Sequence, residues 1–232
     1  MDPEPIMNDA LQTAPAKSIH DLAAEEFFAR ARARLTLAVP AGVSDPDYVP
    51  RAGDHELDPV MAAIAAVRPI KPAAVLVPVV ERAEPMVLLT QRTAHLKNHA
   101  GQISFPGGKI EPTDADPLAA ALRETDEEIA LEGRFIEPIG YLDLYLSAFG
   151  FRIVPTLARV QPGFTLRLNP DEVDDVFEVP LAFLMAPENH QTHTRPWQGM
   201  MRTHYAMPFG ERYIWGATAG ILRNLWERVY KA

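Results

Sequence analysis

The sequence predicts an α+β fold in which a mixed β-sheet is flanked by helices, with a helical N-terminal extension. Strand-like segments outnumber helical ones, and two main helices accompany them, one in the middle of the chain and one at its end. The strand-like segments begin only after a stretch that is rich in prolines and turns. We therefore divide the chain into an N-terminal extension, residues 1–70, and a main domain, residues 71–232.

The extension is predicted to contain helices and turns. Residues 1–16 are polar and lack periodicity, which is typical of a loose tail. From Ser18 to about Ala38, apolar and charged residues alternate as on an amphipathic helix, which we expect to pack on the body of the domain. Residues 40–56 form a turn-rich connector, and Pro59 to Val67 predicts a short helix.

The main domain is predicted to begin with a β-hairpin. Two apolar, β-branched runs, Ala73–Val80 and Met86–Gln91, are separated by a charged turn. The remaining predicted elements are strands at Tyr141–Leu146 and Gly150–Val160, a strand and short helical turn within Val173–Phe183, a second hairpin from His190–Pro196 and Met200–Ala206, a strand at Tyr213–Trp215, and a final helix at Ala217–Tyr230.

Composition excludes several classes of protein. The chain has no cysteine, which rules out disulfides, thiolate zinc sites and a cysteine nucleophile. The formal net charge of −9 has the wrong sign for general affinity to nucleic acid. No apolar run is long enough for a membrane span, and the acidic start does not resemble a signal peptide. We expect a cytoplasmic protein that binds neither nucleic acid nor membrane.

The most informative stretch runs from Gly101 to Leu131. It combines a strand-like segment, a Pro-Gly-Gly turn, an acidic loop and a helix. Asp116 followed by Pro117 predicts an N-cap and a first helical residue, because proline lacks only an N–H that would be unpaired there. One narrow stripe of this helix is expected to face the core, and it consists of Leu118, Leu122, Thr125 and Ile129.

Three carboxylates converge on another side of the same helix. At roughly 100° per residue, Glu124, Glu127 and Glu128 lie one turn apart and repel one another by about 0.2–0.5 kcal/mol per pair. A hard divalent cation such as Mg²⁺ or Mn²⁺ would remove that cost. A solvated acidic face is the simpler interpretation of such a helix alone, but the preceding strand and Gly-Gly turn favour a metal site.

A second group of chemically active residues lies just upstream. The loop within Leu88–Gly108 carries Arg92, His95, Lys97 and His99. Basic side chains next to a carboxylate–metal site are what an anionic substrate needs for placement, although a solvated loop is the alternative. We expect at least one of Arg92 and Lys97 to contact a substrate phosphate.

The central stretch resembles the Nudix box, G-x5-E-x7-R-E-U-x-E-E-x-G-U, in which U is aliphatic. The segment Arg123–Glu128 keeps its Arg-Glu-x-x-Glu-Glu core. Asp114 takes the place of the first glutamate, with eight rather than seven residues before Arg123. Thr125 and Ala130 replace an aliphatic residue and a glycine. The resemblance implies an α/β/α sandwich of the Nudix type and metal-assisted hydrolysis of a diphosphate.

The same resemblance assigns roles to individual residues. It implies metal ligands at Glu124, Glu127 and Glu128, together with the backbone carbonyl of Gly107. Arg123 lies one turn from Glu127 and is expected to hold that carboxylate, which is also what an ordinary helix salt bridge does. The general base stays open, with Glu172 as the first candidate and Glu127 as the second.

The upstream segment resembles the signature of the coenzyme A pyrophosphatase branch of this family, LLTxRSxxLRxHxGQVxFPGG. Here it reads LLTQRTAHLKNHAGQISFPGG, with Thr93 for the serine and Lys97 for the arginine. Three later segments are similar to that branch as well, namely Asn169–Val173, Phe177–Leu181 and Ile214–Ala219. The resemblance implies cleavage of coenzyme A or its derivatives to 3′,5′-ADP and 4′-phosphopantetheine.

Two other functions remain compatible with the sequence. The same site could hydrolyse another nucleoside diphosphate derivative or a nucleoside triphosphate. From a different class, the domain could be a regulator that binds a ligand and has lost its catalytic site. Loss of the catalytic site should remove the box carboxylates, and here they are present. A small-molecule substrate is expected in either case, and the oligomeric state, with a homodimer as one option, is left open.

Overall fold

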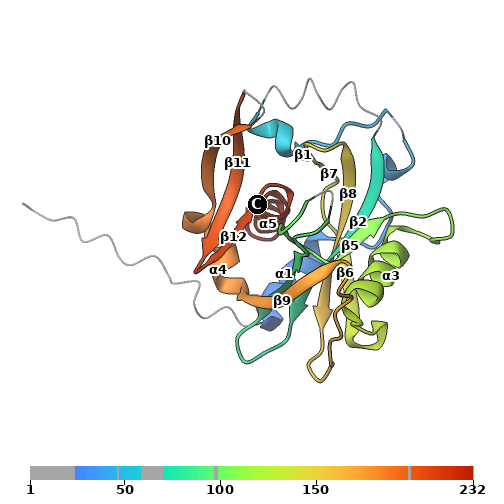
Figure 1. Cartoon of the computed structure of the whole chain (residues 1–232). Coiled ribbons are helices and arrows are strands. Elements are labelled where there is room, and N and C mark those ends of the chain that lie inside the picture. Colours follow the sequence, from blue (N-terminus) through green and yellow to red (C-terminus); the bar gives the residue numbers. More distant parts are fainter. Residues whose placement is uncertain (1–23, 46, 59–69, 97–98, 198–199, 232) are drawn as a thin grey trace, which may run out of the picture.

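The computed structural model describes residues 24–45, 47–58, 70–96, 99–197 and 200–231. Figure 1 shows a mixed sheet with helices on both of its faces, which confirms the predicted α+β class. The helices are α1 (Ala24–Arg34), α3 (Pro117–Ile129), α4 (Leu181–Met185) and α5 (Ala217–Tyr230), with short 3₁₀ turns at Ala41–Val43, Asp54–Glu56, Gly133–Phe135 and Pro187–Asn189. The short helix expected at Pro59–Val67 lies outside the described residues.

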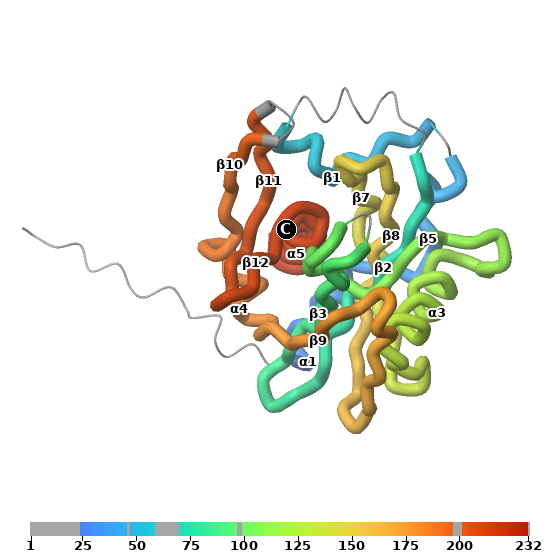
Figure 2. Tube along the Cα trace, in the orientation of Figure 1, coloured from blue at the N-terminus to red at the C-terminus, as the bar shows by residue number. Residues whose placement is uncertain are grey.

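Within the described residues, the strands form a sheet of nine and a separate sheet of three. The larger sheet contains β1 (Ala52–Gly53), β2 (Lys71–Val80), β3 (Met86–Arg92), β4 (Ile103–Ser104), β5 (Gly107–Lys109), β6 (Ile136–Tyr141), β7 (Tyr145–Leu146), β8 (Phe151–Val160) and β9 (Val173–Pro180). The smaller sheet contains β10 (Gln191–Trp197), β11 (Met200–Phe209) and β12 (Arg212–Trp215). The tube in Figure 2 shows this smaller sheet on the side of α5 that faces away from α3.

Both predicted hairpins are confirmed. β2 and β3 pair antiparallel around Val79 and Val87, and β10 pairs antiparallel with β11 along its whole length. The prediction of one strand over Tyr141–Leu146 is wrong, because β6 ends at Tyr141 and a separate strand, β7, begins at Tyr145. The ladder of β6 with β8 continues through a register shift between Pro138 and Gly140 as far as Tyr141, and β7 pairs with the same strand again at Tyr145 and Leu146.

The central strand of the larger sheet is β2, and both of its faces are covered. It runs parallel to β8 over its full length, from Lys71 opposite Phe151 to Val80 opposite Val160. Ala74 and Leu76 pack in a cluster with alanines of α3. Val75, Val77 and Val79 point the other way, toward the core that α1 and α5 share. Burial on two faces explains why its sequence is an apolar run rather than an alternating pattern.

Helix α3 begins where the sequence predicts. The Oδ1 atom of Asp116 accepts a hydrogen bond from the Ala119 backbone N–H at 2.8 Å, and Pro117 is the first helical residue. The helix ends at Ala130, whose φ of 55° is left-handed and whose N–H donates to the Asp126 carbonyl. The N-cap and the C-terminal turn therefore fix which residues α3 presents to the sheet.

The buried face of α3 differs from the predicted stripe. Thr125 and Ile129 are fully buried as expected, but Leu118 and Leu122 are only half-buried. The buried positions include Ala121 and, unexpectedly for a charged residue, Glu128. Ala120 and Ala121 pack against β2, and in this orientation of the helix one predicted metal ligand lies inside the protein.

Helix α1, from the N-terminal extension, packs into the main core. Phe27 and Phe28 are both 0% exposed and belong to the same cluster as residues of α5 and β8. Their rings meet edge to face with centroids 5.3 Å apart. This agrees with the expectation that the amphipathic segment packs on the body of the domain.

Among the helices that the structure describes, none is long and apolar enough to cross a membrane.

We predict that Phe28→Ala lowers the free energy of unfolding by about 3–5 kcal/mol, because it leaves a cavity beneath α1. Chemical denaturation monitored by circular dichroism measures this change. The control is Leu37→Ala, which truncates a side chain that is 47% exposed and should change stability by less than about 0.5 kcal/mol. Equal effects of the two substitutions would show that α1 is only loosely attached.

Candidate active site and metal centre

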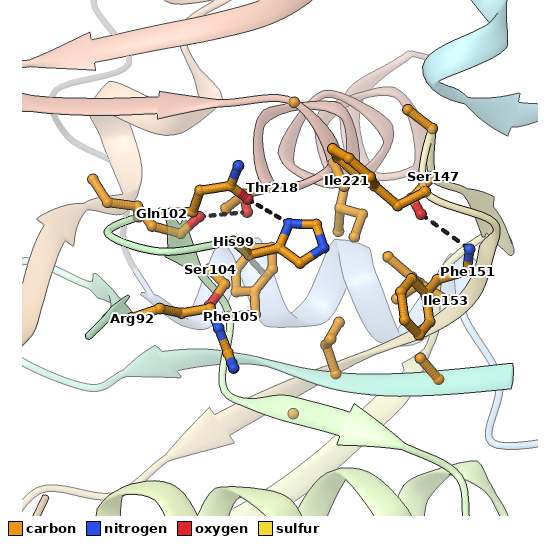
Figure 3. A pocket seen from close by; sticks show the side chains of 18 of the residues that line it. Arg92, His99, Gln102, Ser104, Phe105, Ser147, Phe151, Ile153, Thr218 and Ile221 are labelled. Carbon is orange, nitrogen blue, oxygen red and sulfur yellow. Dashed lines mark hydrogen bonds between the residues drawn. The ribbon is translucent and has the colours of Figure 1, made fainter. Parts of the chain in front are cut away.

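An open cavity of about 820 Å³ is lined by residues of both α3 and the smaller sheet. Its walls come from α3, β5, the end of β3, the loop after β7 and strands β10–β12. Figure 3 shows Arg92, His99 and Phe151 around this space. The predicted acidic residues all reach it, and they are Glu124, Glu127, Glu128 and Glu172.

Two glycines bring the backbone of β5 close to both neighbours. Gly107 has φ 148°, and a Cβ there would lie 2.4 Å from the Ala74 carbonyl oxygen in β2. A Cβ on Gly108 would lie 2.3 Å from the Cδ atom of Glu124 in α3. The predicted Pro-Gly-Gly turn is therefore a short strand squeezed between β2 and the carboxylate face of the helix. Larger residues would push the carboxylates away from this backbone.

Glu128 is the most deeply placed of the acidic residues, at 2% exposure. Its Oε2 atom accepts a hydrogen bond from the Gly107 N–H at 3.1 Å, and its Oε1 atom lies 3.5 Å from Nη1 of Arg92. Burial raises the pKa of Glu128 to about 7, although the Gly107 N–H and the Arg92 charge act in the opposite direction. The neighbouring carboxylates Glu172 and Glu124 raise it further.

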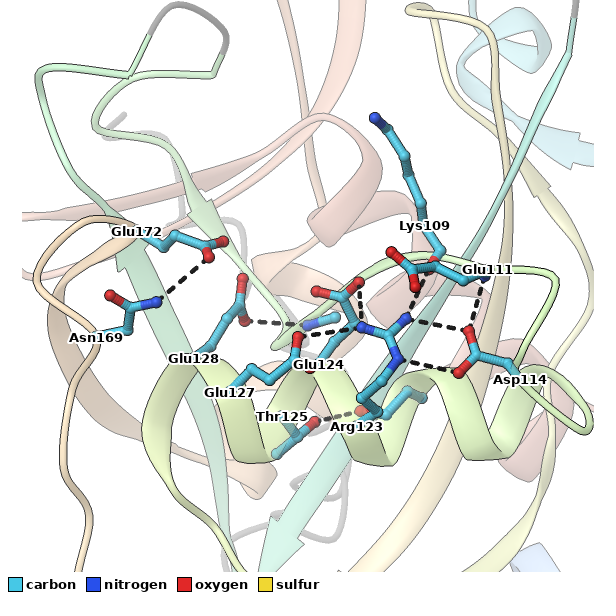
Figure 4. A network of polar contacts seen from close by, with 12 residues as sticks. Lys109, Glu111, Asp114, Arg123, Glu124, Thr125, Glu127, Glu128, Asn169 and Glu172 are labelled. Atoms are coloured by element: carbon cyan, nitrogen blue, oxygen red, sulfur yellow. Dashed lines mark hydrogen bonds and ion pairs between the residues drawn. The ribbon is translucent and has the colours of Figure 1, made fainter.

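Arg123 links the acidic loop to the helix (Figure 4). Its Nε and Nη2 atoms donate to the two oxygens of Asp114, both at 3.0 Å, and its Nη1 atom donates to Glu124 and Glu127, both at 3.1 Å. The carboxylate of Asp114 raises the pKa of Arg123, and the guanidinium lowers the pKa of Asp114. The extra residue before Arg123 therefore does not keep Asp114 from reaching it.

The donor set of this centre suits a hard divalent cation. Among the described residues, no three acidic or histidine side chains are arranged to hold a metal ion as they stand. Arg123 engages one oxygen of Glu124 and one of Glu127, which leaves the second oxygen of each carboxylate for a cation. Burial raises the pKa of Glu124, and the charges of Glu127 and Glu172 add to that effect. A cation among these oxygens would relieve the repulsion.

Glu172 faces the same centre from the loop that precedes β9. Its Oε1 atom accepts a hydrogen bond from the Asn169 side-chain amide at 3.3 Å, and its backbone carbonyl accepts one from Thr93 at 3.0 Å. The Asn169 N–H in turn donates to the Glu128 carbonyl at 2.9 Å. Figure 4 shows Glu172 extending toward Glu128. The loop is thus tied to β3 and to the end of α3, which brings a distant acidic residue to the site.

The predicted basic loop is partly described. Arg92 lies beside Glu128 at the acidic end of the cavity, whereas Lys97 lies outside the described residues. His99 has φ 57°, and its Nδ1 atom is 2.8 Å from the Gln102 Oε1 atom. Its ring meets Phe149 edge to face at 4.5 Å. His99 thus holds the shape of the loop and lines the cavity.

Sequence reasoning missed the wall that the smaller sheet and the extension build. Arg195, Arg202 and Trp215 line the cavity from β10, β11 and β12. The extension contributes Asp54, which lines the cavity, and Asp58, whose Oδ2 atom lies 2.9 Å from Nε of Arg202. Apart from Trp215, these residues belong to no motif in the sequence. The only available signal was the similarity of Ile214–Ala219 to the coenzyme A pyrophosphatase branch, which includes Trp215.

Asp54, in the N-terminal extension, binds the loop that follows β7 in the main domain. Its carboxylate accepts hydrogen bonds from the Tyr145 hydroxyl at 2.7 Å and from the Ala148 N–H at 2.6 Å. Burial raises the pKa of Asp54, against the effect of these two hydrogen bonds and of the Arg202 charge. The loop after β7, which lines the cavity with Ser147, is therefore held from the extension side.

Comparison with known proteins agrees with this geometry. Residues 70–198 match the NUDIX domain family. The chain is 40% identical over 153 residues to the uncharacterized Nudix hydrolase NudL of Escherichia coli strain K12, covering 66% of this chain and 80% of the relative. NudL of Shigella boydii serotype 4 strain Sb227 matches with the same identity and coverage.

Two of the solved structures that match part of this chain are as follows. The binary complex of a C. elegans Ap4A hydrolase is 25% identical, with a TM-score of 0.41 over 48% of this chain and 81% of that one. A MutT/nudix family protein from Enterococcus faecalis is 17% identical, with a TM-score of 0.44 over 71% of this chain and 63% of that one.

The chain belongs to the Nudix family. It is a Nudix-type diphosphatase, a hydrolase of a family that generally uses divalent metal cations. The oxygen donors around Glu128 fit such a cation, as described above.

We predict that Gly108→Ala weakens the binding of a divalent cation by about tenfold or more, because the added Cβ displaces the Glu124 carboxylate. The rise in melting temperature on titration with Mg²⁺ or Mn²⁺ measures that affinity. Gly133→Ala is the matched control, since a Cβ at Gly133 meets no atom within 4 Å. Unchanged cation affinity in Gly108→Ala would mean that Glu124 is not a ligand.

Proposed function

We propose that this enzyme hydrolyses the diphosphate of coenzyme A or a coenzyme A derivative, with Mg²⁺ or Mn²⁺, to 3′,5′-ADP and a 4′-phosphopantetheine product. The observation that carries the proposal is a single cavity with the acidic centre at one end and a cationic, aromatic wall at the other. Coenzyme A has a central diphosphate, which would lie at the acidic centre. On one side of the diphosphate it carries a phosphorylated nucleoside, which would lie at the cationic, aromatic wall. The resemblance of Leu88–Gly108 to the coenzyme A pyrophosphatase signature supports the same substrate.

The residues of the acidic centre divide the work of holding the substrate and the cation. Glu124, Glu127 and Glu128, with the carbonyl of Gly107, would hold the cation, which when bound neutralises the diphosphate and activates water. Arg123 keeps Glu124 and Glu127 oriented through its hydrogen bonds to both. The Gly107 N–H orients Glu128 in the same way.

Arg92 is proposed as a contact of the substrate diphosphate. It lies at the acidic end of the cavity with Nη1 3.5 Å from Glu128, where the diphosphate must meet the cation. A guanidinium there forms charge-assisted hydrogen bonds to phosphate oxygens. Lys97 is proposed as a second phosphate contact on the sequence resemblance.

The proton of the attacking water goes to a carboxylate. Glu172 is the first candidate, because its Oε1 atom accepts only a neutral amide hydrogen bond from Asn169 and no cationic side chain of the described residues forms an ion pair with it. Glu127 is the second candidate, and its carboxylate is engaged by Arg123. A base must reach the water directly, so the two assignments differ in which wall of the cavity faces that water.

We predict that Glu128→Gln abolishes most turnover and lowers cation affinity, whereas Glu172→Gln lowers kcat by about 100-fold or more with cation affinity retained. Steady-state kinetics across a metal titration, together with melting temperatures, separate the two effects. Glu132→Gln is the control, because Glu132 is exposed and pairs with Arg134 away from the cavity. Near-normal turnover of Glu128→Gln at limiting Mg²⁺ would refute the metal assignment.

The substrate proposal is tested with a panel that contains coenzyme A, dephospho-coenzyme A, ADP-ribose, diadenosine polyphosphates and nucleoside triphosphates. We expect coenzyme A to have the highest kcat/KM and to yield 3′,5′-ADP, identified by mass spectrometry. Higher kcat/KM for ADP-ribose or a triphosphate would overturn the coenzyme A assignment and leave the diphosphatase intact. Absence of turnover on every compound with Mg²⁺ or Mn²⁺ would instead favour a ligand-binding protein.

A further inference from the structure

The wall of the cavity built by β10–β12 has a different chemistry from the acidic centre. Within the described residues, its lining side chains include Arg195, Arg202, His204 and Trp215, and none of them is acidic. Figure 1 shows this sheet on the far side of the molecule from α3. A substrate that spans the cavity would thus meet carboxylates and a cation at one end, and cationic and aromatic groups at the other.

Arg195 carries the available positive charge of this wall. It is exposed on the edge strand β10, and its guanidinium lies 4.3 Å from the centroid of the Tyr213 ring. Among the described residues, no carboxylate lies within ion-pair distance of Arg195. Arg202, in contrast, is held by Asp58. A stacked guanidinium keeps its N–H groups at the ring edge, where an anion can accept from them.

The ring beneath Arg195 is itself fixed. The Tyr213 hydroxyl lies 2.7 Å from the Nδ1 atom of His193 and 3.2 Å from the Nε2 atom of His204. The pKa of His204 is lowered, first by burial and then by the charges of Arg195, His193 and Arg202. The guanidinium charges of Arg195 and Arg202 therefore make the local potential positive, and together with burial they favour the neutral form of His204.

Trp215 offers a flat apolar surface beside these groups. It is half-exposed to the cavity, and its ring meets His204 at 5.1 Å with an interplanar angle of 62°. The next residue, Gly216, also lines the cavity, and it has no side chain that could cover the Trp215 ring. Its ring also lies 6.4 Å from the Tyr213 ring at an interplanar angle of 34°. An indole that lines a cavity can bind a nucleobase by stacking, which tolerates any base.

We infer that this wall is the subsite for a 3′-phosphorylated adenosine, with Arg195 bound to the phosphate monoester and Trp215 stacked on the base. A phosphate monoester carries a charge of about −1.5 to −2 near pH 7, and an uncompensated arginine is its natural partner. Arg92, beside Glu128, belongs to the diphosphate end instead. The inference rests on the proposed function and adds a residue that selects coenzyme A over dephospho-coenzyme A.

The first test compares kcat/KM for coenzyme A and dephospho-coenzyme A. Arg195→Ala should lower the value for coenzyme A by about tenfold, through KM, and change that for dephospho-coenzyme A by less than about twofold. Arg195→Lys should recover part of the loss, because it keeps the charge. The control is Arg212→Ala. Arg212 is a cation of the same sheet, but it pairs with Asp175 and does not line the cavity.

The second test measures nucleotide binding without turnover, by calorimetry with 3′,5′-ADP and 5′-AMP in the presence of EDTA. The wild-type enzyme should bind 3′,5′-ADP more tightly than 5′-AMP, Arg195→Ala should lose that difference, and Trp215→Leu should weaken both ligands equally. Equal losses on both substrates, or a 3′-phosphate preference that survives Arg195→Ala, would overturn the subsite.

The two proposals can fail separately. If wild type does not hydrolyse coenzyme A, the proposed function is wrong, and the calorimetry still decides whether Arg195 recognises a 3′-phosphate. If wild type hydrolyses coenzyme A and Arg195→Ala does so equally well, the proposed function holds and the subsite assignment is wrong.

Discussion

The site depends on how closely the backbone of β5 approaches its neighbours on both sides. Gly107 lies against the Ala74 carbonyl of β2, and Gly108 lies against the carboxylate of Glu124. This spacing lets a backbone N–H reach the buried Glu128, and it keeps α3 pressed on the central strand through small alanines. The acidic centre is therefore a product of backbone packing as much as of side-chain chemistry.

Local patterns were enough to predict much of this fold. The hairpin of β2 and β3, the start of α3 at Asp116 and the final helix follow from periodicity and capping, which depend on residues close in sequence. The box carboxylates could be found in the same way, because one helix carries them. Glu172 could be proposed only through resemblance, since its position depends on a loop held by Asn169 and Thr93.

The remaining features depend on contacts between distant segments. Burial of Glu128 follows from the rotation of α3 against β2, which a helical wheel does not fix. The ion pair of Asp58 with Arg202 joins residues 144 positions apart, and neither residue belongs to a recognisable pattern. Such long-range pairs decide which strands share a cavity, and a single sequence contains no periodic signal for them.

The N-terminal extension holds the cavity wall that lies opposite the acidic centre. The shape of that wall and the chemistry of the acidic centre therefore depend on different parts of the chain. Asp54 and Asp58 precede the family match at residues 70–198, yet they hold the loop after β7 and the strand that carries Arg202. Neither of them contacts the box carboxylates through a hydrogen bond that the structure describes. We therefore expect substitutions of Asp54 or Asp58 to change the shape of the cavity wall opposite the acidic centre, and with it the molecules that fit, while the carboxylates of α3 keep their own contacts.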